Sequence, residues 1–350
     1  MRVVKAISIC WIIAGILGFF VDLTIPRATA QSNPETVVVP SNPNEYPTTR
    51  FWLANGSLPV KNAWEAPAPE LINAVILDID ERDIVCISKG KTEPSKLPSA
   101  QLQAIDVVWG TEAAAAAHAA FLSEDFSTAI NLAKTAIAEG KIPRWQQKIL
   151  ASEITDSLVR LGQISNACRV FISLCKESPA PMLYVSAPLN WTSERGNTQL
   201  IQQAQEWIKP ERAPIEQLIG ASWLLNSGEA QSAQAILEQL SRSRKSPVTQ
   251  LATAQLWRSV LPNQVAEQYA EWSAIRDRML MPLQLGPTRT IADRLERTGK
   301  KDLGLQEWLR IVSLYPKHRV EFQQARDAAA ELLKQLGRPE EAHLLLMNKP

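Results

Sequence analysis

A small residue recurs through the last two thirds of this chain at intervals of 33 or 38 residues, with one interval of 66. Larger apolar residues follow it at helical spacing. Fixed periods of this size are typical of supersecondary units that stack and share a continuous core. Because 66 is twice 33, the long interval predicts one more unit, anchored at Leu200. The small anchors are Ala129, Ala167, Ala233, Ala266, Gly304 and Ala342.

A second small residue stands twelve positions before each small anchor, as expected where the two helices of a hairpin cross closely. The exception precedes Leu200, where Pro188 occupies that position. Since proline removes a helical hydrogen bond, the first helix of the third unit should be short, bent or absent. The pattern predicts seven helical hairpins over residues 111–350. The small positions of the first helices are Ala117, Thr155, Ala221, Ala254, Ala292 and Ala330.

These small positions, with a glycine between the helices of several hairpins, resemble the tetratricopeptide repeat family. The resemblance covers about 240 residues. Its longer spacings and missing aromatic positions depart from the family pattern, so the Sel1-like repeats, also helical hairpins, fit as well. The resemblance implies a mainly α-helical solenoid with a concave groove. The family's turn glycine is matched at Gly162, Gly228, Gly299 and Gly337, and its terminal proline at Pro179 and Pro316.

The resemblance further implies that the first helices line the groove and that a protein or peptide partner binds there. The Lys and Asn pattern by which some family members hold a C-terminal carboxylate is absent. Trp191, in the irregular stretch APLNWTSERG, is the candidate for an exposed aromatic anchor, whereas tryptophans within predicted helices are expected in the core. The implied groove residues are His118, Phe121, Asp156, Arg160, Asn226, Arg258, Arg289, Asp293 and Arg297.

Residues 50–109 have a different texture, with short runs of β-branched and aromatic residues between turn signals. The runs at 74–77 and 84–87 predict two strands, and a closing strand is expected at 105–109. Four or five such strands within this length predict a small sheet or an SH3-like barrel in front of the helical repeats.

Two turns in this segment carry a signal of their own. Asn55-Gly56 follows a β-rich run and predicts a hairpin. Asp78, Asp80 and Asp83 lie in the charged turn between the two central strands. A calcium loop would need a glycine at its turn and a distal bidentate glutamate, and both are missing. The charged turn is therefore interpreted as a solvated hairpin turn.

The first thirty residues are typical of a signal peptide. A basic start, an apolar run at 6–21 and the small-x-small sequence ending at Ala30 predict cleavage before Gln31. The alternative is an uncleaved anchor, because roughly 20 apolar residues can span a bilayer. A Pro- and Asn-rich linker is expected at 31–49. We expect a protein exported to the periplasm or extracellular space, outside the membrane after cleavage.

Composition and motifs narrow the function further. The chain has 37 basic and 36 acidic residues, a net charge of +1, so nucleic acid is not an expected partner. No phosphate-binding glycine loop, nucleophile elbow or metal-ligand spacing occurs, so catalysis, cofactor and metal are not expected. Cys86, Cys168 and Cys175 are expected to be buried thiols.

Two hypotheses about function remain. The first is an exported scaffold or adaptor that binds a protein or peptide through the concave face of its helical repeats. The second is a structural or carbohydrate-associated envelope protein in which the β segment at 50–109 does the binding. The repeat pattern favours the first, because a single hairpin cannot bury its apolar face and stacked hairpins present a long groove.

Overall fold

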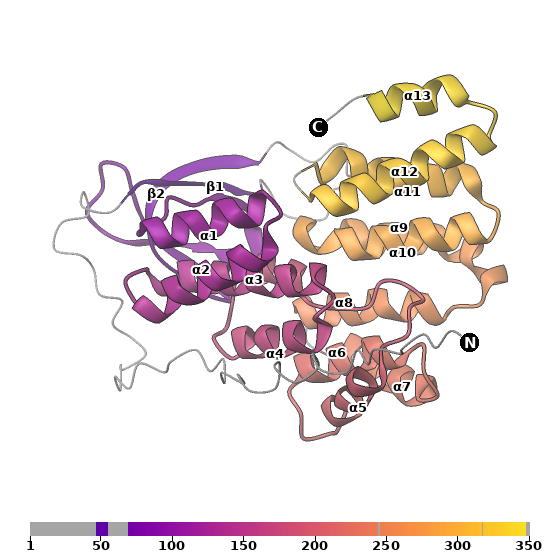
Figure 1. Cartoon of the computed structure of the whole chain (residues 1–350), viewed down its shortest axis with the longest axis horizontal. Coiled ribbons are helices and arrows are strands. Elements are labelled where there is room, and N and C mark those ends of the chain that lie inside the picture. Colours follow the sequence, from indigo (N-terminus) through magenta and orange to yellow (C-terminus); the bar gives the residue numbers. More distant parts are fainter. Residues whose placement is uncertain (1–46, 55–68, 244–245, 317, 348–350) are drawn as a thin grey trace, which may run out of the picture.

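The computed structural model describes residues 47–54, 69–243, 246–316 and 318–347 and is mainly helical, with a small sheet on its N-terminal side (Figure 1). The predicted signal peptide with its cleavage site, nearly all of the linker, and the Asn55-Gly56 turn lie outside the described residues. None of the described helices combines the length and the hydropathy needed to cross a bilayer.

The β segment forms a five-stranded antiparallel sheet with the strand order β4-β3-β2-β1-β5. The expected small β module is thus present, and β4 and β5 are the first and last strands of this order. The two central strands are confirmed, whereas the closing strand begins and ends three residues earlier than predicted. The strands are β1 (Thr49–Leu53), β2 (Glu70–Ile79), β3 (Asp83–Ser88), β4 (Ser95–Pro98) and β5 (Leu102–Asp106).

The charged turn between β2 and β3 is held by one carboxylate. Oδ1 of Asp80 accepts hydrogen bonds from the backbone N–H groups of Arg82, at 2.7 Å, and Asp83, at 2.8 Å. Such local side-chain to backbone bonds stabilise tight turns. Asp80 is therefore part of the hairpin, as the hairpin interpretation of this turn predicted.

The rest of the described chain consists of α-helices joined by short turns. Glycines in left-handed conformation end several of them, including Gly140 after α2 and Gly299 after α10, with φ of 66° and 76°. The helices are α1 (Glu112–Leu122), α2 (Phe126–Glu139), α3 (Arg144–Arg160), α4 (Ile164–Cys175), α5 (Thr198–Trp207), α6 (Pro214–Leu224), α7 (Ala230–Ser241), α8 (Pro247–Leu256), α9 (Val265–Asp277), α10 (Leu285–Arg297), α11 (Lys301–Leu314), α12 (Arg319–Gln335) and α13 (Pro339–Met347).

Small residues mark the contacts between paired helices. None of the small positions in the first helices is more than 2 % exposed, and α1 packs on α2, α3 on α4, α6 on α7, α10 on α11 and α12 on α13. A Cβ placed on Gly304 would lie 3.4 Å from the carbonyl oxygen of Ala292, the residue twelve positions earlier. The twelve-residue pairing therefore corresponds to a close helix crossing.

The fifth unit departs from this rule. Ala266 is only half-buried, and Val265 next to it is fully buried instead. The rings of Trp257 and Trp272 stack within this unit with centroids 5.5 Å apart. At this unit the buried residue is thus Val265 rather than the predicted anchor Ala266, and two large aromatic side chains pack in the same cluster.

The third unit has no first α-helix, as its proline predicted. Residues Pro181–Ser186 form a 3₁₀ turn, and the chain then runs through the irregular stretch 187–197. Asn197 begins α5, with its side-chain oxygen accepting a hydrogen bond from the N–H of Leu200 at 2.9 Å. Leu200 itself is buried, as expected for the anchor of this unit.

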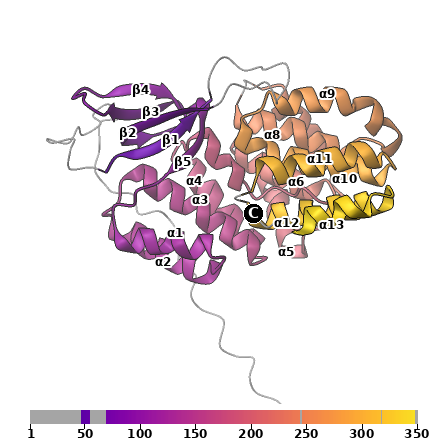
Figure 2. The same cartoon turned by 90° about the horizontal axis from the view of Figure 1, so that it is seen from above.

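The sheet and the helices share one apolar cluster. Trp145 on α3 is buried in that cluster together with strand residues such as Phe51 and Ile76. Nζ of Lys148, also on α3, donates to the carbonyl of Ile79 at 3.0 Å, and burial lowers the pKa of this lysine. Figure 2 shows the sheet beside α3, on the side away from the C-terminal helices.

Buried aromatic and thiol side chains complete the core. The tryptophans expected inside helices are at most 8 % exposed, which confirms their place in the core: Trp207, Trp223, Trp257, Trp272 and Trp308. Cys86 and Cys168 are buried and Cys175 is half-buried, and the three described cysteines form no disulfide. Burial raises the pKa of all three thiols, that of Cys175 to about 12.

The close crossing of α10 and α11 makes a direct prediction. Gly304→Leu should lower the free energy of unfolding by about 1–3 kcal/mol, because its side chain would displace the backbone of α10. Gln306→Leu, at an exposed position of the same helix, is the matched control and should change stability by less than about 0.5 kcal/mol. Urea denaturation followed by circular dichroism measures both. Equal effects of the two substitutions would contradict the close crossing.

Candidate binding pocket

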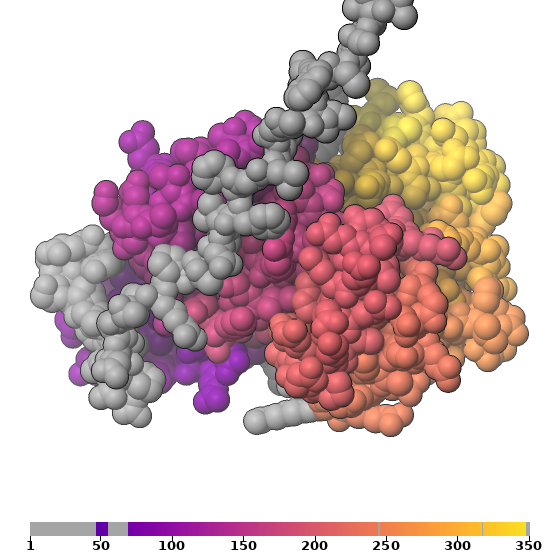
Figure 3. Space-filling view, turned by 60° about the horizontal axis from the view of Figure 1, so that its bottom comes forward, coloured from indigo at the N-terminus to yellow at the C-terminus, as the bar shows by residue number. Residues whose placement is uncertain are grey.

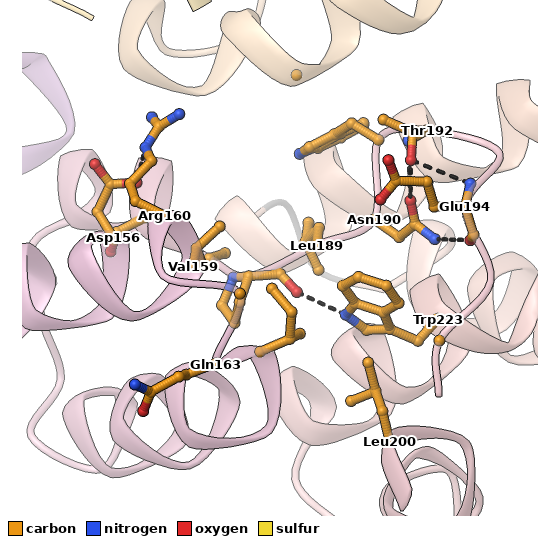
Figure 4. Close-up of a pocket in the computed structure, with 18 of the residues that line it drawn as sticks. Asp156, Val159, Arg160, Gln163, Leu189, Asn190, Thr192, Glu194, Leu200 and Trp223 are labelled. Atoms are coloured by element: carbon orange, nitrogen blue, oxygen red, sulfur yellow. Dashed lines mark hydrogen bonds and ion pairs between the residues drawn. The ribbon is translucent and has the colours of Figure 1, made fainter. Parts of the chain in front are cut away.

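A pocket of about 870 Å³ lies between α3, the stretch at 184–200, α10 and α12 (Figure 4). Residues from the middle and the two ends of the helical part meet here. In the space-filling view the C-terminal helices, in yellow, lie behind the helices formed by residues 200–250, in red and orange (Figure 3). The chain also brings α12 near α3, where Arg160 and Glu321 are hydrogen-bonded, although most of the helical sequence separates them.

The lining of the pocket divides into apolar and polar parts. Buried or half-buried apolar side chains from several elements line it, and Leu189 lies in the centre of the close-up (Figure 4). Exposed polar and charged side chains also line the pocket. The apolar lining includes Val159, Leu189, Leu200, Leu283 and Leu285, and the exposed polar lining includes Gln163, Asn166, Arg169, Glu194, Arg195, Asn197, Gln199 and Gln324.

One wall of the pocket is the irregular stretch 187–197, held by side chains from α6. The Oγ of Ser222 accepts a hydrogen bond from the N–H of Asn190 at 2.8 Å. Nε1 of Trp223 donates to the carbonyl of Pro188 at 2.9 Å. These bonds satisfy buried backbone groups of an irregular segment, which would otherwise lose their hydrogen bonds to water.

Polar residues of neighbouring elements hold the next part of the same stretch. Nδ2 of Asn226 donates to the carbonyls of Thr192, at 3.2 Å, and Glu194, at 3.1 Å. Nη2 of Arg258 donates to the carbonyl of Thr192 at 2.7 Å, and burial together with Arg294 lowers the pKa of Arg258 to about 10. Two predicted groove residues, Asn226 and Arg258, thus bind the chain's own backbone.

Trp191 is not the exposed anchor expected from the sequence. Its side chain is half-buried and packs against α10, where a Cβ added to Gly286 would lie 2.2 Å from the indole ring. Only glycine leaves room for the ring at this point of α10. The irregular composition of 187–197 indicated a solvent-exposed loop, but contacts with α6 and α10 bury residues 187–190 and half-bury Trp191, while residues 193–195 stay exposed.

A cluster of charged side chains connects α3 with α12. Nη2 of Arg160 donates to both carboxylate oxygens of Glu321, at 2.7 and 2.8 Å, although 161 positions separate the two residues. Asp156 lies 3.4 Å from the same guanidinium. Burial by itself would lower the pKa of Arg160, but the two carboxylates raise it above its usual range. Burial raises the pKa of Asp156, and Arg160 opposes that rise.

The remaining predicted groove residues separate into two groups. His118 lies outside the pocket lining, with Nδ1 2.7 Å from the Oε1 of Glu153, and Phe121 likewise packs elsewhere, edge-on against Phe126. On α10, Nε of Arg297 donates to Asp293 at 2.9 Å, and Nη1 of Arg297 reaches the Oγ of Ser193 at 3.3 Å. Arg289 lines the pocket and has no hydrogen bond or ion pair within the described residues.

The structure therefore brings Asp156, Arg160 and Arg289 together at one pocket. Sequence reasoning missed Glu321, which is not among the implied groove residues. No local pattern distinguishes Glu321, since its role depends on how closely α12 approaches α3. The irregular path of residues 187–197 could be anticipated from the sequence, because Pro188 stands at a position that a helix would otherwise occupy.

Comparisons with models of known protein families, with curated proteins and with solved structures gave no match to this chain. Within the described part of the chain, no group of three or more His, Cys, Asp or Glu side chains could hold a metal ion. Histidine and cysteine are also absent from the pocket lining that the described residues form. The polar groups available to a ligand are mainly guanidinium, carboxylate, amide and hydroxyl groups.

The contact of Trp191 with α10 gives a second prediction. Gly286→Ala should lower the free energy of unfolding by about 1–3 kcal/mol, because the new methyl group overlaps the indole ring. Gly228→Ala is the matched control, since a Cβ there meets nothing within 4 Å. Thermal denaturation compares the variants, and tryptophan fluorescence reports the displaced ring. A fully stable Gly286→Ala protein would contradict the buried position of Trp191.

The charged cluster predicts a loss of stability in acid. Burial lowers the pKa of His318 below its ordinary 6.5, while Glu321 and Asp156 oppose this shift and Arg160 adds to it. The unfolded chain therefore takes up a proton at His318 before the folded chain does. Stability is present above about pH 6.5 and is lost as the pH falls toward the folded pKa, by at most about 1.4 kcal/mol per pH unit.

His318→Gln removes this group and should make the free energy of unfolding less dependent on pH between neutrality and the mildly acidic range. Urea denaturation at a series of pH values measures the difference. His343→Gln, at an exposed position of α13, is the matched control. An equal reduction of the pH dependence in both variants would show that the buried site of His318 is not responsible.

Proposed function

We propose that this chain is an exported, non-enzymatic scaffold of the tetratricopeptide type that binds a peptide segment of a partner protein in the pocket between α3, α10 and α12. Export is supported by the signal-peptide pattern of the first thirty residues. The solenoid arrangement is supported by the buried small residues at the crossings of paired helices and by the packing of each pair on the next.

One observation carries the binding proposal. Two side chains that directly follow the first helices α6 and α8, those of Asn226 and Arg258, already hold an irregular stretch of chain through hydrogen bonds to its carbonyls. Beside that stretch the same face remains hollow, with an apolar lining and polar groups around it. Concave pockets that combine buried apolar side chains with a few polar groups are the usual binding sites of proteins. A second extended segment, supplied by a partner, fits this hollow.

The proposal that the chain is not an enzyme rests on the chemistry of the lining. General acid–base and nucleophilic catalysis need a nucleophile within hydrogen-bond reach of a base. The charged groups on the α3–α12 side, Asp156, Arg160 and Glu321, are bound to one another. Guanidinium groups dominate the rest of the charged lining, and they recognise anions rather than transfer protons.

A displayed library of random linear peptides, selected against the purified full chain, tests the proposal. Enriched peptides should lose binding to Val159→Trp, because the indole fills the hollow. Leu161→Trp, at an exposed position just after the same helix and outside the pocket, is the matched control and should bind the peptides normally. Circular dichroism verifies that both variants fold.

Two outcomes would contradict the proposal. One is that no peptide is enriched. The other is that the enriched peptides bind the Val159→Trp and Leu161→Trp proteins equally well. The test uses point variants because Trp145 and Lys148 join the sheet to α3, so deletion of the β segment would expose part of the helical core.

A further inference from the structure

The unpaired charges of the pocket indicate which peptides it prefers. We infer that it selects extended segments in which an apolar side chain is flanked by Asp or Glu, with Arg289 as the main selective residue. The inference rests on the proposed function, since it specifies the ligand of the same pocket.

One face of α10 turns toward the pocket and the stretch beside it. Gly286, Arg289, Asp293 and Arg297 follow one another at spacings of three, four and four residues, which places them on the same side of a helix. The Trp191 ring covers Gly286, and Asp293 neutralises Arg297. Arg289 is thus the cation of this row that lacks a partner among the described residues.

The residues that line the pocket carry a net charge of +1. Their four arginines and three acids give 4 − 3 = +1. Two of those acids, Asp156 and Glu321, form ion pairs with Arg160. These three residues together carry a net charge of −1. The remaining lining carries three arginines and one glutamate, which gives 3 − 1 = +2. These remaining residues are Arg169, Arg195, Arg289 and Glu194.

The hydrogen bonds that hold the stretch 187–197 indicate which contacts could select one peptide sequence over another. Asn226 and Arg258 contact backbone carbonyls of Thr192 and Glu194, and such contacts are available to any sequence. Sequence preference has to come from side-chain contacts. In the open part of the pocket those contacts are the apolar lining and the guanidinium groups that have no acidic partner, above all that of Arg289. Guanidinium binds carboxylate through two parallel hydrogen bonds, which amide side chains cannot match in strength.

Two labelled synthetic peptides test the inference on the purified full chain. In the first a Leu is flanked by Asp and Glu, and in the second the acids are replaced by Asn and Gln. Fluorescence anisotropy at low salt should give the acidic peptide an affinity about tenfold higher, since hydrogen bonds to charged groups are the stronger ones. The difference should shrink as salt is added, because the arginines border solvent.

Arg289→Ala should remove most of that tenfold difference, because it should weaken binding of the acidic peptide far more than binding of the amide peptide. Arg278→Ala is the matched control, because Arg278 is exposed after α9 and lies outside the pocket lining. Retention of the full preference by Arg278→Ala and its loss in Arg289→Ala would support the assignment. Retention of the preference by both variants would overturn it.

Failure of this inference can be told apart from failure of the proposed function. If library peptides bind in a manner that Val159→Trp abolishes, yet the acidic and amide peptides bind equally, the pocket binds peptides without selecting acids and the inference is wrong. If no library peptide binds and neither synthetic peptide binds, the proposed function and the inference both fail.

Discussion

Close approach of paired helices at buried small residues is the constraint on which the rest of this structure depends. Where Gly304 meets the backbone of Ala292, no larger anchor would fit without moving α10. Repeated contacts of this kind set the spacing of consecutive pairs, and the spacing determines which distant helices meet. The pocket exists because α12 comes within ion-pair distance of α3, as Arg160 and Glu321 show. The fifth unit, in which Trp257 and Trp272 stack, is a local exception to this pattern of small-residue crossings.

The defect in the pattern is as informative as the pattern. Proline at the small position of the third unit removes a helix, and the freed stretch passes between α6 and α10. Its backbone groups are then buried and need partners, which Ser222, Asn226 and Arg258 provide. The protein thus uses these side chains to hold its own backbone, and the pocket lies beside the stretch that they hold.

Electrostatics then divides that pocket. On one side, a guanidinium between two carboxylates satisfies its own charges and ties α3 to α12. On the other, arginines without acidic partners face an opening with an apolar lining. In a partly buried site such unsatisfied charge has a larger effect on a ligand than on an open surface, because water screens it less. The contrast between the two sides is the basis for assigning a ligand class to one of them.

Much of the architecture could be predicted from the sequence, because small residues, turn glycines and prolines act locally. The helical units, the break at Pro188, the buried tryptophans and the central strands of the sheet were predicted in this way. The site was predicted only in part. Asp156, Arg160 and Arg289 were named, but Glu321 and the inward course of Trp191 were not. Their roles depend on which elements far apart in the chain come close together. That in turn depends on the angles and distances at which all the intervening helices cross. Local sequence therefore determined the units, and only the tertiary structure decided which residues face one another.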